Sequence, residues 1–374
     1  MFFHVTLTTE CNLQCKYCFG ETLEDFDEDF SDFKIDYSLP KKANYNWNLL
    51  AEFCRKDPQC VVTFYGGEPL LSSSEIEQII DSVPAKHFMI QTNGLLLDRL
   101  APKYVNRFHT ILVSIDGDQK LTDHYRGKGT FRKVINNLKM VVKNGFKGEL
   151  IARMTVMEQT DIEKQVKWLT DNMEFNFSSI HWQLNAGFWG NDFGRRNFNE
   201  WSKTSYNPGI KRLARFWVDN MDQNGIVLKL YPFLGIANSL LHKEMSLLRC
   251  GGGWINYAIQ TDGFIIPCPT MWGMKDFYLD HIKDANPLRL KKVFIEDEPC
   301  TNCDIFGLCG GRCLYANLTK RWNKDAYNSV CDTVRVLIQA IKTELPRIES
   351  LIDSGKISPK CFDIMKYNGC EIIP

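Results

Sequence analysis

The 374-residue sequence has no excess of charge of either sign, because 45 Lys and Arg residues balance 45 Asp and Glu residues. This balance gives no reason to expect nucleic acid or a membrane surface as a partner. No run approaches the ~18 apolar residues that a membrane span needs. The first residues also lack the basic start and the long apolar stretch of a signal peptide. We therefore expect a cytoplasmic protein; nothing in the sequence indicates its oligomeric state.

Cysteine is plentiful, with 14 residues, and three of them form one short motif. Cys11, Cys15 and Cys18 are spaced C-x3-C-x2-C, with the aromatic Tyr17 just before the last. Three thiolates on one loop can hold three irons of a four-iron cluster and leave the fourth iron open for a chelating substrate. A zinc site would normally recruit a fourth protein ligand. A purely structural or metal-storage role for the three cysteines is the alternative. Exposed clusters and thiolates oxidise readily, so the composition indicates a reducing, anaerobic environment.

A second cysteine series occupies the last third of the chain. The C-x2-C spacing within it is shared by iron–sulfur sites and zinc knuckles, so both chemistries are possible. A disulfide framework is disfavoured because the chain is long and shows no secretory segment. The series consists of Cys250, Cys268, Cys300, Cys303, Cys309, Cys313 and Cys331.

Strand-like and helix-like segments alternate through the first half of the chain, which predicts an α/β fold with a parallel sheet. Six such units would form a partial (β/α)6 barrel resembling a TIM barrel, with its site at the carboxyl ends of the strands. Residues 185–210 are predicted to be a bridging loop. The acidic stretch 24–30 is predicted to be a solvated loop, or else a lid or a strip for docking a basic peptide. Strands are expected at 3–8, 61–64, 87–90, 111–115, from 150 and at 180–184, and helices from about 73, after 94, at 131–142, near 161 and at 328–350.

Three further motifs follow expected strands. The turn Gly66-Gly67-Glu68-Pro69 lets the backbone approach a ligand closely, and its carbonyl groups can accept a hydrogen bond from an ammonium group. Ser114 and Asp116 lie two residues apart at a strand end and therefore point to the same side. Arg126 follows shortly afterwards, and a guanidinium group binds a carboxylate through two parallel hydrogen bonds. The structural alternative for Ser114 and Asp116 is an ordinary strand-end turn. The structural alternative for Arg126 is a surface salt bridge.

Together these motifs resemble the radical S-adenosylmethionine (SAM) superfamily, in which the open iron binds the amino and carboxylate groups of SAM. The reduced cluster of that family cleaves SAM to a 5′-deoxyadenosyl radical. The resemblance implies that the glycine turn contacts the SAM amino group, that Ser114 and Asp116 contact the ribose, and that Arg126 contacts the carboxylate. It adds Tyr17, Gly66, Gly67, Glu68, Pro69, Gln91, Asn93 and Leu184 to the expected cofactor-binding residues.

The C-terminal cysteines resemble the SPASM extension of radical SAM enzymes that modify peptides and proteins, which binds two auxiliary clusters. The resemblance thus implies three [4Fe-4S] clusters and SAM as cofactors. It assigns Cys300, Cys303, Cys309 and Cys331 to an outer cluster, and Cys250, Cys268 and Cys313 to an inner one. The inner cluster is one ligand short, so we expect an open iron there. The competing account completes it with Cys361, Cys370, Cys54 or Cys60.

The resemblance implies a radical SAM barrel at 1–190, a bridge at 191–247, the SPASM extension at 248–340 and a C-terminal tail at 341–374. It further implies a peptide or protein maturase, related to anaerobic sulfatase-maturating and sactipeptide-maturase enzymes, that receives electrons from a ferredoxin or flavodoxin. A thioether or other cross-link near cysteine is favoured. Formylglycine formation is disfavoured because Pro269 stands where the sulfatase maturases carry an acidic residue. A small-molecule substrate and a non-enzymatic electron carrier are the alternatives, and the general base is not identified.

Overall fold

The computed structural model describes residues 1–18, 32–186, 192–320 and 322–369, so the acidic stretch 24–30 and Cys370 lie outside the described residues. Two compact units are present and are described separately. Unit 1 consists of Met1–Ala152 and Gly252–Phe294, and unit 2 of Arg153–Gly251 and Ile295–Pro374. Within the described ranges, no helix is both long and apolar enough to cross a bilayer.

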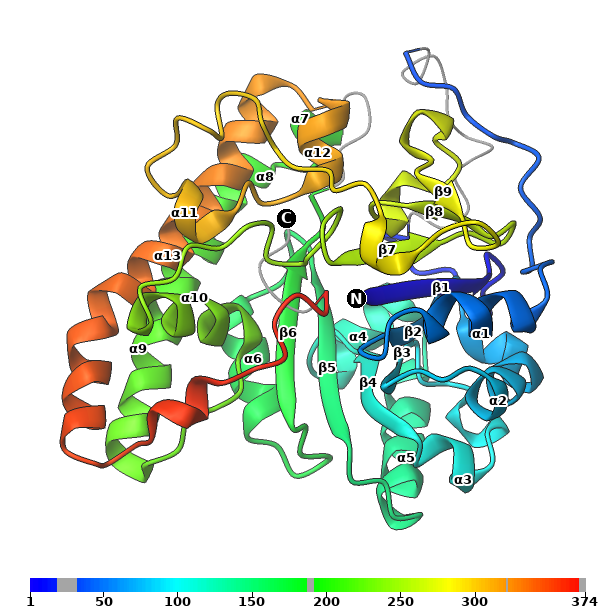
Figure 1. Ribbon diagram of the computed structural model, residues 1–374. Coiled ribbons are helices and arrows are strands. Elements are labelled where there is room, and N and C mark those ends of the chain that lie inside the picture. Colours follow the sequence, from blue (N-terminus) through cyan, green and yellow to red (C-terminus); the bar gives the residue numbers. More distant parts are fainter. Residues whose placement is uncertain (19–31, 187–191, 321, 370–374) are drawn as a thin grey trace. The chain divides into compact units, whose positions relative to one another are not determined.

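Unit 1 is built on a sheet whose strands run in the order β4-β3-β2-β1-β7-β8-β9. The pairs from β4 through β7 are parallel, and β8 and β9 are added antiparallel. In Figure 1 the yellow β7 lies beside the dark blue β1, and β8 and β9 continue the sheet beyond β7. The strands are β1 (Phe2–Thr8), β2 (Val61–Gly66), β3 (His87–Thr92), β4 (Phe108–Ser114), β7 (Asn256–Ile259), β8 (Phe264–Ile266) and β9 (Asp280–His281), and β5 (Glu149–Val156) begins in this unit.

Helices connect the parallel strands of unit 1, as parallel pairing requires. The core is aromatic: Phe3 on β1 meets Phe53 edge to face at 4.9 Å, and Phe64 stacks on Phe88. The side chains of Asn46 and Asp118 cap the first turns of two of the helices. The helices are α1 (Trp47–Arg55), α2 (Ser73–Ser82), α3 (Pro102–Val105), α4 (Gln119–Arg126) and α5 (Thr130–Lys143), with short 3-10 turns η2 (Pro69–Ser72), η3 (Leu97–Arg99), η5 (Pro269–Met271), η6 (Lys275–Phe277) and η7 (Pro287–Arg289).

Unit 2 is mostly helical and shows that one sequence-based expectation was wrong. Residues 185–210 were expected to form a loop, yet most of the described part is helical. Phe198 and Trp201, two of the aromatic residues that suggested a loop, are buried in the core, as is Tyr206. The elements are β6 (Ser179–Leu184), α6 (Ile162–Thr170), α7 (Asp192–Arg195), α8 (Phe198–Trp201), the π-helix η4 (Ser202–Tyr206), α9 (Asn207–Asn224), α10 (Tyr231–Leu241), α11 (Phe306–Cys309), α12 (Leu314–Thr319), α13 (Lys324–Asp353) and η8 (Pro359–Phe362).

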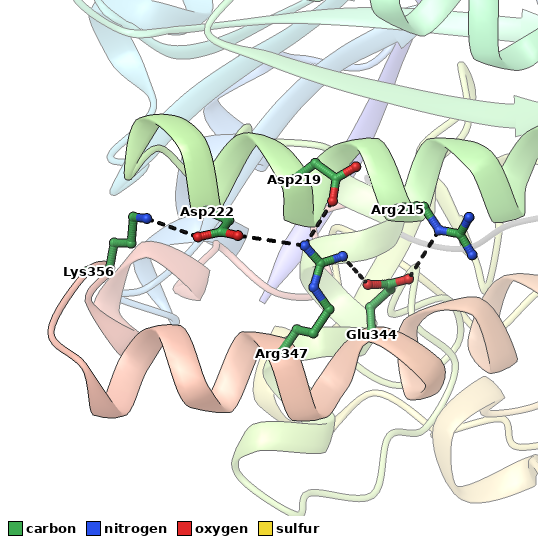
Figure 2. A network of polar contacts seen from close by, with 6 residues as sticks. All are labelled: Arg215, Asp219, Asp222, Glu344, Arg347 and Lys356. Atoms are coloured by element: carbon green, nitrogen blue, oxygen red, sulfur yellow. Dashed lines mark hydrogen bonds and ion pairs between the residues drawn. The ribbon is translucent and has the colours of Figure 1, made fainter.

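The long helix α13 is held against α9 by a network of charged side chains (Figure 2). Arg347 is central: it bonds Asp219 at 2.8 Å and Glu344 at 2.9 Å. Asp222 bonds Lys356 at 2.9 Å. Most of these groups are partly exposed, so each pair contributes only about 0–1 kcal/mol, and the buried apolar faces of the two helices supply most of the stability. This packing fixes the position of α13 relative to α9 within unit 2. The N-terminal half of α13 carries Cys331.

Candidate functional site

The cysteine motif leaves the end of β1, and the glycine turn after β2 packs directly against its beginning. A Cβ atom on Gly66 would lie 2.1 Å from the carbonyl oxygen of Thr8, and one on Gly67 would lie 2.3 Å from that of Glu10. Gly66 also has φ +141°, a conformation that side chains disfavour. The amides of Gly67 and Glu68 donate to the carbonyls of Thr8 and Glu10 at 2.8 and 2.9 Å. The paired glycines therefore fix the chain that leads into Cys11.

Glu68 of the same turn points inward and joins two strand ends. Its side chain is fully buried and accepts hydrogen bonds from the Leu70 amide, the Thr92 hydroxyl and the Asn93 amide at 3.0, 2.7 and 2.7 Å. The Asn93 side chain in turn reaches the cysteine loop, with Nδ2 2.8 Å from Asn12 Oδ1 and 3.9 Å from Cys11 Sγ. Glu68 thus acts on the loop through Asn93.

Burial raises the pKa of Glu68 to about 7, against the opposing effect of these hydrogen bonds. A folded-state pKa above the usual 4.5 means that this group contributes stability below about pH 4.5, which is lost as the pH rises through 7. We expect the free energy of unfolding of the wild type to fall, relative to Glu68→Gln, by on the order of 3 kcal/mol across this window. Urea unfolding at a series of pH values measures it. Glu52→Gln, an exposed acid on α1, is the control; a pH-independent difference for Glu68→Gln would contradict the expectation.

A second anchor holds the other end of the cysteine motif. Asp116, which follows β4, binds Arg126 of α4 through two hydrogen bonds of 2.9 and 2.8 Å. The Tyr17 hydroxyl donates to Asp116 at 2.6 Å, and the guanidinium of Arg126 lies 5.4 Å from the centre of the Tyr17 ring. Asp116 is fully buried and Arg126 is 6% exposed. The residue next to Cys18 is therefore tied to a buried ion pair.

The three motif cysteines on this braced loop form no disulfide with any residue that the structure describes. Burial raises the pKa of Cys15 to about 11, although Arg126 opposes the rise, and burial also raises the pKa of Cys11. Metal binding deprotonates such thiols, because the thiolate is the ligand. Three soft sulfur donors at one sheet edge fit an iron–sulfur cluster. The chemistry of the donor set therefore agrees with the predicted cluster, and the assignment of these ligands stays a prediction.

Parallel strands bring the other predicted residues of unit 1 to the same edge of the sheet. Gln91 near the end of β3 and Ser114 at the end of β4 are half-buried, whereas Pro69 is buried and begins a 3-10 turn. Leu184, at the end of β6, is buried in unit 2. Asn12 and Thr92, which complete the Glu68–Asn93 contacts, were not among the predicted site residues. Both lie inside motifs that were already recognised, so their positions were a usable signal.

The C-terminal cysteines assigned to the outer cluster lie in one place in unit 2. Cys300, Cys303, Cys309 and Cys331 all line a cavity of about 650 Å³. Cys300 Sγ lies 3.0 Å from the Tyr327 hydroxyl, and Arg335 donates to Cys303 Sγ at 3.0 Å. Burial raises the pKa of Cys309 to about 11, and the charge of Arg312 opposes the rise. Four sulfur donors around a cavity suit a four-iron cluster.

The remaining cysteines are divided between the two units. Of the three residues assigned to the inner cluster, Cys250 and Cys313 belong to unit 2 and Cys268 to unit 1. Cys54 and Cys60 are fully buried in unit 1, with their sulfur atoms 3.2 Å apart. Cys361 is exposed. The ligand set of the inner cluster stays a prediction.

Residues 5–167 match the family model described as the radical SAM superfamily. They form a radical SAM domain. The chain is 24% identical to a cysteine-type anaerobic sulfatase-maturating enzyme of Clostridium perfringens, over 87% of this chain and 91% of that one. It is 21% identical to the radical SAM cyclopropyl synthase TigE of Paramaledivibacter caminithermalis, over 90% and 73%.

A solved structure, native anSMEcpe with bound AdoMet and the Cp18Cys peptide, superposes with a TM-score of 0.67 at 18% identity, covering 95% of this chain and 99% of that one. This likeness shows the fold, and it confirms the predicted class: an open, partial α/β barrel with a C-terminal extension. The radical SAM domain implies SAM and one four-iron cluster as cofactors, which is part of the prediction; the two auxiliary clusters stay a prediction. The resemblance to the radical SAM superfamily is thereby confirmed.

Proposed function

We propose that this radical SAM enzyme is a maturase that abstracts hydrogen from a peptide or protein side chain, using two auxiliary clusters in its C-terminal region. The observation that carries the proposal is the cavity lined by Cys300, Cys303, Cys309 and Cys331. It is a second group of sulfur donors, outside the radical SAM domain of residues 5–167. A peptide substrate is supported by relatives whose names specify sulfatase maturation, and by the neighbour whose structure holds a peptide.

In this proposal Cys11, Cys15 and Cys18 hold the catalytic cluster, which supplies a 5′-deoxyadenosyl radical from SAM when both are bound. The chain's own residues keep the loop in place. The Gly66–Gly67 turn fixes its beginning, Asn93 contacts Cys11, and Tyr17 fixes its end through Asp116. Such bracing holds the reacting groups in a constant geometry, which is a large part of catalytic efficiency.

The modification favoured is a thioether or another cross-link near cysteine. Pro269, at the start of η5, supports a chemistry other than formylglycine formation, since the place of the acidic residue is taken. In the proposed inner cluster, Cys250, Cys268 and Cys313 leave one iron without a protein thiolate. An open iron can bind and deprotonate a substrate thiol. The electron donor is proposed to be a ferredoxin or a flavodoxin.

Iron content tests the number of clusters. After anaerobic reconstitution we expect about twelve iron atoms and a similar amount of sulfide per chain, from three clusters of four. Replacing Cys300 and Cys303 together by Ala should lower the value to about eight. A wild-type value near four, or zinc in place of iron, would exclude two auxiliary clusters.

Matched controls separate ligands from other thiols. Cys54→Ala removes a buried cysteine whose neighbour is Cys60, and it should leave the iron content and cluster spectra unchanged. The same result for Cys361→Ala and Cys370→Ala supports an open iron in the inner cluster, whereas loss of a cluster signal in either one identifies the missing ligand. Mass spectrometry of a candidate peptide co-expressed with the enzyme then tests the substrate class: an unmodified peptide alongside turnover of a small molecule would favour the small-molecule alternative.

A further inference from the structure

Arg312 is a buried cation with no hydrogen-bond partner among the described residues. Its side chain is 2% exposed, and none of its three nitrogen atoms is hydrogen-bonded to any residue that the structure describes. A buried charge is strongly unfavourable unless an opposite charge or hydrogen bonds compensate it. The position therefore points to an anionic group that is absent from the polypeptide itself.

The backbone around Arg312 is built to bring this side chain into the cysteine cavity. Gly310, Gly311 and Arg312 have φ values of +68°, +90° and +67° in succession. A left-handed conformation is unfavourable for a residue with a long side chain, and it persists only where the surroundings enforce it. The chain leading to Arg312 is tightly packed, since a Cβ atom on Gly310 would lie 2.1 Å from the Leu247 carbonyl oxygen. Gly311 and Arg312 both line the cavity.

Two aromatic rings hold the guanidinium but do not neutralise it. Its carbon lies 4.7 Å from the centre of the Trp322 ring and 4.5 Å from that of Tyr327. Such contacts orient a cation and partly compensate its lost hydration. Tyr327 also contacts Cys300 Sγ through its hydroxyl at 3.0 Å. The aromatic pocket and the cysteine ligands are therefore directly connected.

The other charged groups that line the cavity are exposed. The carboxylates are those of Glu298, Asp304 and Asp332. Arg335, the second cation, is 41% exposed and is paired with Asp304 at 2.6 Å. Arg312 is thus the buried cation of a cavity whose sulfur donors would be anionic when they bind iron.

We propose that Arg312 is the counter-charge of the outer auxiliary cluster and raises its reduction potential. The proposal rests on the proposed function, in which the four cysteines hold that cluster. Reduction adds one electron, taken from a low-potential donor that is oxidised in the same step, and makes the cluster more negative. A fixed positive charge in a poorly solvated cavity stabilises the reduced form more than the oxidised form. Arg312 is therefore a positioning and tuning residue, not a ligand.

Redox titration followed by electron paramagnetic resonance tests this, with dithionite as reductant. The full chain carrying Cys11→Ala, Cys15→Ala and Cys18→Ala simplifies the spectrum, and the outer-cluster signal is the one lost on Cys300→Ala with Cys303→Ala. In this background Arg312→Met should lower the midpoint potential of that signal by at least 59 mV, a tenfold change in the one-electron reduction equilibrium. Arg312→Lys retains the charge and should shift it less.

Lys320→Met is the matched control, because it removes a positive charge of the same unit that is 63% exposed and already paired with Asp297 at 3.2 Å. Its shift should be smaller than that of Arg312→Met. Equal midpoint potentials in the parent and in Arg312→Met would overturn the proposal, as would failure of both Arg312→Met and Arg312→Lys to assemble the cluster. Assembly in Arg312→Lys but not in Arg312→Met supports a need for the charge. Absence of the signal from the parent itself would instead contradict the proposed cluster.

Discussion

Replacing Cys11, Cys15 and Cys18 together by Ala is expected to abolish formation of 5′-deoxyadenosine. In the proposed assignment these residues are the protein ligands of the cluster that binds SAM, so their loss removes the site of cleavage. The fold should survive, because Cys11 and Cys18 are exposed and the loop is held by other groups. Those groups are the Gly66–Gly67 turn and Tyr17.

Two measurements on the triple variant separate loss of the cluster from loss of the fold. Liquid chromatography of reaction mixtures with dithionite and SAM quantifies 5′-deoxyadenosine, and the iron assay should give about eight atoms from the two auxiliary clusters. Cys54→Ala, which removes a buried thiol of the same unit, should retain product formation. Reductive cleavage of SAM by the triple variant would show that another cluster binds SAM.

The parallel strands could be predicted because each is a short apolar run followed by a turn signal. The expected strands at 3–8, 61–64, 87–90 and 180–184 all lie within observed strands. The addition of β7 to β1 was not predicted, since pairing Phe2 with Asn256 depends on contacts that no local pattern encodes. The loop expected at 185–210 failed for a related reason: Phe198 and Trp201 of this segment are buried by tertiary packing.

The sequence predicted which residues belong to the site, but not where their side chains point or whether they are buried. The motif around Glu68 is evident from the sequence, yet only the structure shows that its carboxylate is turned inward to Thr92 and Asn93. Arg312 lies between two predicted ligands, Cys309 and Cys313, and nothing in the sequence shows that its charge is buried. Burial and hydrogen-bond partners are properties of the folded chain, so they were beyond the reach of spacing arguments.

The buried hydrogen-bond partners of Arg126, which the sequence did not reveal, change the effect expected of a substitution there. From the sequence, this arginine was expected to face the SAM carboxylate, and its loss would then affect binding alone. In the structure both Asp116 oxygens accept from Arg126, and both side chains are buried. Removing one partner of a buried ion pair leaves an uncompensated charge, which costs about 3–5 kcal/mol. Tyr17 would lose its cationic neighbour as well.

Arg126→Met should therefore lower the free energy of unfolding by about 3–5 kcal/mol and reduce loading of the catalytic cluster. Anaerobic urea unfolding and the iron assay measure the two effects. Asp116→Asn is the matched partner: in the double variant the uncompensated carboxylate is gone, so much of the lost stability should return, and a double-mutant cycle gives the coupling. Weaker SAM binding with an unchanged unfolding free energy would instead show that Arg126 acts on SAM and contributes little to the fold. A structural role of Arg126 therefore predicts a change in the free energy of unfolding, whereas a role in SAM binding predicts a change in the affinity for SAM alone.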